Sequence, residues 1–134
     1  MTDMADCIFC KIVSGDIPAE KVYEDDMFFA FLDIKPINPG HTLILPKQHV
    51  DQIFDVDDPL YGEIFRLAKR LSSPLKKVAA SPRVGLVVEG FGVPHVHVHL
   101  IPIYKGNELN PERAKTATPE ELKEMGDKLR AAMH

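Results

Sequence analysis

The feature that most constrains the fold is the segment Pro94–Pro102, in which three histidines alternate with apolar residues. Because side chains of a β-strand point alternately to its two faces, a strand here places His95, His97 and His99 on one face and the intervening valines and leucine on the other. The second face is apolar enough to cover a core. Imidazole has an unperturbed pKa close to neutral pH, which suits it to act as an acid, a base, a nucleophile or a metal ligand. The function is therefore expected on the histidine face.

The length of the chain predicts one domain. Its 134 residues are enough for a core and too few for two ordinary domains. We expect a single domain over residues 1–134, with its core at about residues 6–103 and a C-terminal extension with a helix at residues 104–134. The composition, with 45% hydrophobic and 27% charged residues, is typical of globular proteins and not of disordered chains.

The charge balance excludes some classes of partner. A net charge of -4 and a pI near 5.8 provide no general attraction to nucleic acid or to an anionic membrane, so phosphate would have to be bound by local groups. The sequence has no apolar run of about 18 residues that could span a bilayer, and its first residues lack the apolar segment of a secretion signal. We expect a cytoplasmic protein that binds neither nucleic acid nor membrane.

The order of the predicted elements favours an α+β fold with an antiparallel sheet. Apolar and β-branched runs between turn residues predict five strands, at residues 21–24, 27–34, 41–45, 84–88 and 94–103. Capping residues and helical spacing predict a short helical turn at residues 6–13, a long central helix after residues 57–59 and a last helix from Thr118 to about Met133. Pro74 should break or kink the central helix, because proline has no backbone N–H. Strands that mostly follow one another in sequence indicate antiparallel pairing.

Three histidines along one strand allow more than one chemistry. Alternate strand residues are about 6.6 Å apart, so His95 and His99 lie about 13 Å from each other, whereas a zinc–nitrogen bond is about 2.1 Å long. Two neighbouring histidines can bind one ion, but three in a row hardly can. In a second interpretation, His97 is a nucleophile whose opposite N–H is held by a carbonyl or another acceptor, and His99 protonates the leaving group. A polar surface strand would need no function at all, but three histidines in register within an apolar strand favour a site.

Several segments together resemble the histidine triad (HIT) family. Its signature of three histidines separated by apolar residues is matched at His95–Ile101, and segments at residues 7–12, 17–20, 24–26, 31–34 and 40–49 resemble its Hint-like branch with an N-terminal C-x-x-C. The resemblance implies a HIT-like α+β fold, with an antiparallel meander sheet of about five strands, a long central helix and a C-terminal helix. It also implies a homodimer that acts as a nucleotide hydrolase or transferase on the α-phosphate of phosphoramidates, acyl-adenylates or dinucleoside polyphosphates.

The resemblance implies roles for single residues. His97 would form a nucleotidyl-imidazole intermediate that water then cleaves, His99 would assist the leaving group, and His41 would complete the histidine cluster around the phosphate. Asp33 would accept hydrogen bonds from the ribose hydroxyls. The apolar slot for a purine base would consist of Ile8, Phe9, Ile12, Phe31 and Ile34. Without the resemblance, each apolar residue is better explained as core, and Asp33 equally well as a turn carboxylate.

The only two cysteines, Cys7 and Cys10, are too close for a disulfide framework. In a reducing compartment such a C-x-x-C pair indicates metal binding or redox activity, and two buried core thiols are an equal alternative. The resemblance implies a structural zinc ion held by both cysteines with His49 and His95, since two thiolates and two imidazoles make a tetrahedral zinc site. A metalloenzyme that uses two triad histidines is disfavoured, because such a zinc ion already has its ligands.

One loop departs from the pattern of the family. Where relatives carry an asparagine and then a polar Gly-Gln-Ser-like run, this chain has Glu89-Gly90-Phe91-Gly92-Val93-Pro94. Glu89 would repel phosphate unless it points away or orients a histidine, and backbone N–H groups of Gly90 or Gly92 would do part of the phosphate binding. We count Glu89 and Gly92 among the candidate nucleotide-binding residues. The altered loop also supports an alternative function, a nucleotide-binding regulatory module with weak or vestigial catalysis.

Overall fold

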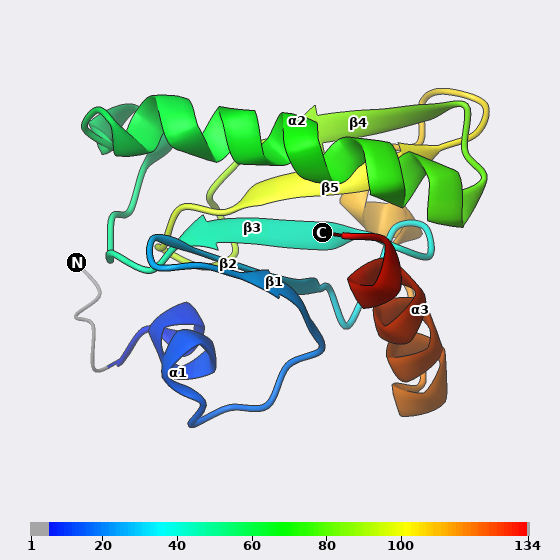
Figure 1. Ribbon diagram of the computed structural model, residues 1–134, viewed down its shortest axis with the longest axis horizontal. Helices are drawn as coiled ribbons and strands as arrows, with labels where there is room; N and C mark the ends of the chain where they lie inside the picture. The colour runs from blue at the N-terminus through cyan, green and yellow to red at the C-terminus, as the bar shows by residue number, and fades with distance from the viewer. Residues whose placement is uncertain (1–5, 134) are drawn as a thin grey trace.

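Two buried strands form the centre of the sheet. β2 (Phe28–Leu32) and β3 (Thr42–Pro46) are rich in aromatic and branched apolar residues and are buried along their whole length. In the computed structural model, which describes residues 6–133, β1 pairs with β2, β5 with β3 and β4 with β5, where β1 is Lys21–Glu24, β4 is Arg83–Val87 and β5 is Val98–Ile103. All pairs are antiparallel, and the strand order is β1-β2-β3-β5-β4 (Figure 1).

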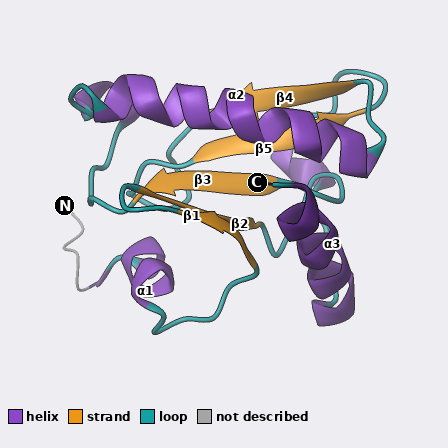
Figure 2. Cartoon of the chain, in the orientation of Figure 1, coloured by secondary structure: helices purple, strands orange, loops and turns teal. Residues whose placement is uncertain are grey.

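The antiparallel sheet and its helices confirm the predicted α+β fold. The meander consists of β1, β2 and β3; α2 (Leu60–Ala79) then carries the chain to the edge of the sheet, and β5 returns between β3 and β4. Two long loops, at residues 47–59 and 88–97, therefore meet at the same end of the sheet (Figure 2). The first of them contains the 3-10 turn η2 (Ile53–Asp55). The histidine strand lies inside the sheet, and β1 and β4 are its two edge strands.

Each face of the sheet has its own apolar cluster. Phe28, Ala30 and Leu32 of β2 pack under α2 together with Leu129 of α3 (Pro119–Ala132), whereas alternate residues of the same strand pack against α1 (Ile8–Ser14). Figure 1 shows α2 across one face and α1 at the other. A helix of seven residues is not stable alone, so the buried side chains of α1 are what attach it to the sheet.

The central helix runs unbroken through Pro74. Of the break or kink predicted for this residue, the break is therefore wrong. Proline removes one N–H donor that would bond the carbonyl of Arg70, and Arg70 is exposed, so water can replace the lost bond. Leu71 and Leu75 are buried on either side of the proline and hold the helix to the sheet.

The C-terminal extension packs on the rest of the chain. It contains a 3-10 turn, η3 (Pro111–Arg113), and then α3, whose first turn is closed by a capping box between Thr118 and Glu121. Arg130 of α3 pairs with Glu20 at 2.7 Å. The last helix thus begins and ends where the sequence predicts. Within residues 6–133, no helix has the length and apolarity needed to cross a membrane.

Candidate active site

The histidine segment keeps its two different faces, although it is a strand only from Val98. Before that residue the backbone bonds elsewhere: the N–H of Val96 donates to the carbonyl of Val50 at 2.7 Å, away from β3. The strand predicted at residues 94–103 is therefore too long at its start. The valines and the leucine of the segment nevertheless lie in the cluster under α2, and two of the three histidines contact Phe9 of α1 on the opposite face.

A backbone carbonyl fixes the tautomer of His97. Its Nδ1 lies 2.7 Å from the carbonyl oxygen of His95, and because that oxygen can only accept, Nδ1 carries the proton and Nε2 keeps a free lone pair. The ring of Phe9 meets the imidazole edge to face, with 4.9 Å between centroids, and limits its rotation. A nucleophilic histidine requires this arrangement; the role of nucleophile itself stays a prediction.

His41 and His99 form a hydrogen-bonded pair. Nε2 of His41 lies 2.9 Å from Nδ1 of His99, and the backbone N–H of Ile37 donates to Nδ1 of His41 at 3.1 Å. Because Nδ1 of His41 accepts, its proton is on Nε2 and is donated to His99, which leaves the proton of His99 on its own Nε2. Burial, together with the nearby His97, lowers the pKa of both histidines to about 4, so the pair is neutral at pH 7.

Asp33 lies beside this pair, with its Oδ2 at 3.7 Å from Nε2 of His41. Asp33, His41 and His99 are close enough to hold a metal ion, but both nitrogens of His41 are engaged in hydrogen bonds, so it has no free lone pair for a metal. The other oxygen of Asp33 accepts the N–H of Lys35 at 2.8 Å, and burial raises the pKa of the carboxyl. The geometry thus disfavours a catalytic metal at this pair.

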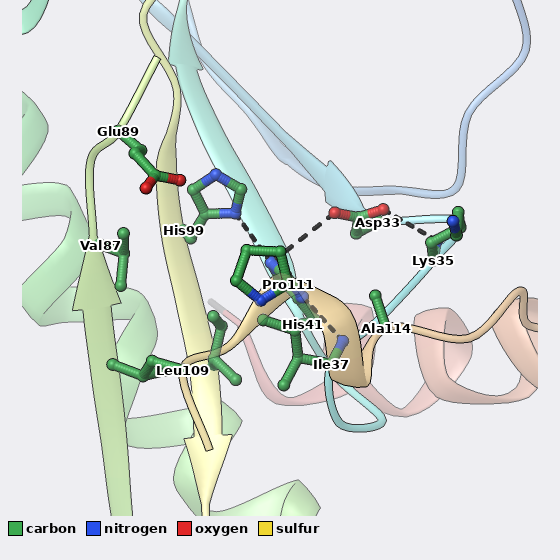
Figure 3. Close-up of a pocket in the computed structure, with 11 residues that line it drawn as sticks. Asp33, Lys35, Ile37, His41, Val87, Glu89, His99, Leu109, Pro111 and Ala114 are labelled. Carbon is green, nitrogen blue, oxygen red and sulfur yellow. Dashed lines mark hydrogen bonds and ion pairs between the residues drawn. The ribbon is translucent and has the colours of Figure 1, made fainter. Parts of the chain in front are cut away.

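These three residues line a hollow of about 360 Å³, which we call the Asp33 hollow. Figure 3 shows its wall, made by β4, β5, the loop after β2 and the C-terminal extension. The extension contributes Leu109, Pro111 and Ala114. Sequence reasoning missed these residues, and it had no signal to find them, because they follow the last family motif and only tertiary packing brings them to the site.

Glu108 holds the extension in place. Its carboxylate accepts the backbone N–H groups of residues 104, 105 and 106 at 2.7 to 2.9 Å, and it accepts a further hydrogen bond from the Asn38 amide at 3.1 Å. These donors lower the pKa of Glu108 to about 2. Asn38 also donates to the carbonyl of Pro102 at 2.8 Å, so the loop before His41 and the extension are tied to the end of β5.

A second hollow, of about 370 Å³, reaches His97 and is called here the Phe54 hollow. It lies between the two long loops and is lined by Asp51, Gln52, Ile53, Phe54, Val88, Glu89, Gly90, Phe91, Val96 and His97. Glu89 lines both hollows. Gly92, a predicted nucleotide-binding residue, lines neither, whereas Gly90 lines the Phe54 hollow.

The residues expected to form the base slot divide into two groups. Phe9, Ile12 and Phe31 are buried in the cluster under α1, and Phe9 connects this cluster to His97. Ile8 and Ile34 are exposed, by 45% and 64%. The buried residues thus serve as core in this structure, and the two exposed isoleucines are the ones that a base could cover.

The four residues of the predicted metal site are brought together. Nδ1 of His95 lies 3.3 Å from Sγ of Cys7, 3.5 Å from Sγ of Cys10 and 3.3 Å from Nδ1 of His49. Sγ of Cys10 lies 3.4 Å from Nδ1 of His49. A tetrahedral zinc ion with bonds of about 2.1 Å to nitrogen and 2.3 Å to sulfur needs separations of about 3.4 Å between nitrogens and about 3.6 Å between nitrogen and sulfur.

The protonation of His95 also fits a metal. Its Nε2 donates to the carbonyl of Pro46 at 2.8 Å, so its Nδ1 is a free lone pair that points at both cysteines. The side chain of Cys7 also accepts the N–H of Cys10 and thereby caps α1. Chemistry and spacing of the four residues therefore fit zinc.

Comparison with known proteins gives matches over most of the chain. Residues 14–106 match the model of the HIT domain. An adenosine 5′-monophosphoramidase of Schizosaccharomyces pombe is 36% identical over 129 residues and covers 92% of this chain and 95% of its own. A Hit-like protein from Bartonella henselae has a TM-score of 0.86 at 32% identity and covers 98% of this chain and 99% of its own. A Zn-bound histidine triad family protein from Mycobacterium smegmatis has a TM-score of 0.83 at 30% identity, covering 98% and 95%.

Proposed function

Because the chain belongs to the histidine triad (HIT) family, we propose that it is a nucleotide hydrolase or transferase that acts at the α-phosphate of purine nucleotide derivatives. Such substrates are nucleoside phosphoramidates, acyl-adenylates and dinucleoside polyphosphates. The observation that carries the proposal is the free Nε2 of His97, which results from the hydrogen bond of its Nδ1–H to a backbone carbonyl. The ring of His99 is close by, with 4.9 Å between the two ring centroids. The activity named for the yeast relative supports the reaction class.

The reaction would proceed in two steps. Nε2 of His97 attacks phosphorus with its lone pair, the bond to the leaving atom breaks, and that atom keeps the electron pair and receives a proton from the His41–His99 pair through Nε2 of His99. Water then attacks phosphorus, the electron pair of the phosphorus–nitrogen bond returns to His97, and the proton of the water returns to the pair. The result is hydrolysis, or transfer when another acceptor replaces water.

The Asp33 hollow is the proposed place of the nucleotide. Asp33 would accept the ribose hydroxyls, since a diol suits a carboxylate, and the exposed Ile34 with Ile8 would cover the base. Lys35 lines the same hollow and supplies positive charge for the phosphate, beside histidines that carry none at neutral pH.

We also propose that Cys7, Cys10, His49 and His95 hold a structural zinc ion. The fit of their spacing to tetrahedral coordination supports it. Bound there, zinc would supply four bonds that fasten the start of α1 to the end of β3 and to the segment before β5. Because His95 precedes the nucleophile by two residues and its carbonyl holds His97, the ion would also steady the site.

We also propose a homodimer and a cytoplasmic location. A homodimer is implied by the family, and β4 offers an edge on which, within residues 6–133, no further strand pairs; light scattering of the purified protein tests it. The proposal of a cytoplasmic location is supported by the two cysteines, which are free thiols within reach of a metal, because the cytoplasm keeps thiols reduced.

A second candidate function is a nucleotide-binding regulatory module with weak catalysis. Glu89 favours it, because the residue lines both hollows and would place a negative charge close to the phosphate. Both functions predict that the protein binds nucleotides, but only the hydrolase or transferase predicts rapid turnover.

The deciding experiment follows AMP release from adenosine 5′-phosphoramidate with wild type and His97→Ala, each with and without a chelator. We expect His97→Ala to lose at least about a thousandfold in kcat while it still binds AMP. Met27→Ala is the control replacement, because it truncates an exposed side chain that lines neither hollow, and it should keep turnover. Undiminished turnover by His97→Ala would refute the nucleophile, binding without turnover by wild type would favour the module, and prompt loss on chelation without unfolding would favour a metalloenzyme.

A further inference from the structure

The Phe54 hollow has two exposed aromatic rings on its rim. Phe54 and Phe91 are 84% and 92% exposed, and they come from the two different loops that meet there. One exposed phenylalanine is ordinary on a protein surface. Two of them, on the rim of a hollow that contains the proposed nucleophile His97, offer flat apolar surface to a molecule that reacts at this histidine.

The charges of this hollow are all of one sign. Asp51 and Glu89 carry carboxylates, and none of the described residues that line it is lysine or arginine. The Asp33 hollow, in contrast, contains Lys35. A group that carries several phosphates would therefore be repelled from the Phe54 hollow, and an amine, which is cationic once released, would be attracted.

We propose that the Phe54 hollow binds the leaving group of the substrate and selects an amine that carries a flat apolar group. This inference rests on the proposed function, in which the nucleotide occupies the Asp33 hollow and His97 attacks phosphorus between the two. Glu89 lines both hollows, so in this proposal it stands where the leaving nitrogen would pass from one hollow to the other. The substrate class is thereby narrowed to nucleoside phosphoramidates of apolar or aromatic amines.

The chemistry of the step agrees with these groups. The phosphorus–nitrogen bond breaks, the nitrogen keeps the electron pair and takes a proton from the His41–His99 pair, and the amine leaves as a neutral base that solvent protonates at pH 7. The carboxylate of Glu89 then faces an ammonium ion, which it attracts, and not a phosphate group, which it would repel. The replacement of the usual asparagine by Glu89 becomes a determinant of specificity.

The test uses three substrates that share AMP and differ in the leaving group. These are adenosine 5′-phosphoramidate, its N-(2-phenylethyl) derivative, and diadenosine triphosphate, which release ammonia, 2-phenylethylamine and ADP. In wild type, kcat/KM should be highest for the phenylethyl compound. Phe54→Ala and Phe91→Ala should each lower the ratio of kcat/KM for the phenylethyl compound to kcat/KM for adenosine 5′-phosphoramidate by about tenfold. Met27→Ala truncates an exposed side chain away from this hollow and should leave that ratio unchanged.

Glu89→Gln tests the charge. We expect it to raise kcat/KM for diadenosine triphosphate relative to the phenylethyl compound by about tenfold, and Glu120→Gln, an exposed charge change on α3, to have no such effect. An unchanged ratio in the two phenylalanine variants, or in Glu89→Gln, overturns the inference.

A binding measurement separates this inference from the proposed function. The ¹⁵N-labelled protein, saturated with AMP, is titrated with 2-phenylethylamine and, separately, with pyrophosphate. The amine should shift the amide signals of Phe54, Gly90 and Phe91, and pyrophosphate should not. If wild type releases AMP from none of the three substrates, the proposed function fails, while the titration still decides the subsite: shifts confined to other residues, or equal shifts with pyrophosphate, refute it.

Discussion

The buried His41–His99 pair should make the protein less stable in acid. Burial lowers the pKa of each histidine from 6.5 to about 4. Between these pH values the unfolded chain binds protons that the folded chain does not, so the free energy of unfolding is greatest above pH 6.5 and falls as the pH is lowered toward 4. The difference between the two pKa values corresponds to about 3 kcal/mol for one histidine, and to less than twice that for the pair, because the two groups interact.

The variant His41→Asn isolates one of these contributions. An asparagine oxygen can still accept the N–H of Ile37, which donates to Nδ1 of His41 at 3.1 Å, but the side chain no longer titrates. Urea unfolding at pH 7, 6, 5 and 4 should show that wild type loses about 3 kcal/mol more than the variant between pH 7 and 4. Histidine ¹⁵N spectra provide a direct check, with His41 neutral and protonated on Nε2 down to about pH 4. Equal pH dependence of the two proteins, or a His41 that titrates near 6.5, would refute the hydrogen-bond assignment.

Three further changes have definite expected outcomes. Removal of zinc by a chelator should release about one ion per chain and lower the melting temperature, since the ion would join three separate segments of the chain; elemental analysis and thermal scans measure both. Leu109→Ala, which removes apolar wall from the Asp33 hollow, should raise KM for AMP conjugates a few-fold with kcat nearly unchanged. Thr118→Ala should lower the free energy of unfolding by about 1 kcal/mol through loss of the capping box, whereas Thr116→Ala, an exposed threonine outside that box, should not; urea titrations compare them.

Local pattern predicted the parts of the structure that local physics decides. The alternation at residues 94–102 predicted which side chains enter the core and which lie on the opposite, histidine face, because that depends only on the two faces of an extended chain. The capping residues at Thr118 predicted the start of α3, because the hydrogen bonds of a capping box join residues only three positions apart. Pro74 was misjudged because burial of the flanking leucines, which the proline itself does not reveal, holds the helix together.

Long-range contacts were beyond the reach of pattern. The approach of His41 to His99 joins residues 58 positions apart, and only the family resemblance placed them in one cluster. Leu109 and its neighbours reach the Asp33 hollow because Glu108 binds Asn38. This contact joins two polar residues 70 positions apart, and no periodicity in the sequence predicts it. Contacts of this kind depend on the packing of the finished fold.

The division of labour among the histidines is set by the backbone. His95 gives its Nε2–H to the carbonyl of Pro46 and keeps Nδ1 for a metal, His97 gives its Nδ1–H to a carbonyl and keeps Nε2 for phosphorus, and His41 accepts an amide N–H at Nδ1 and donates to the third triad histidine. Four chemically identical imidazoles therefore acquire different free atoms from groups that every residue possesses. A sequence motif can show that histidines are present, but the roles follow from where the chain places its carbonyls and amides. A substitution that moves the backbone near Pro46 or Ile37 should thus alter the chemistry of the site as strongly as the loss of a histidine.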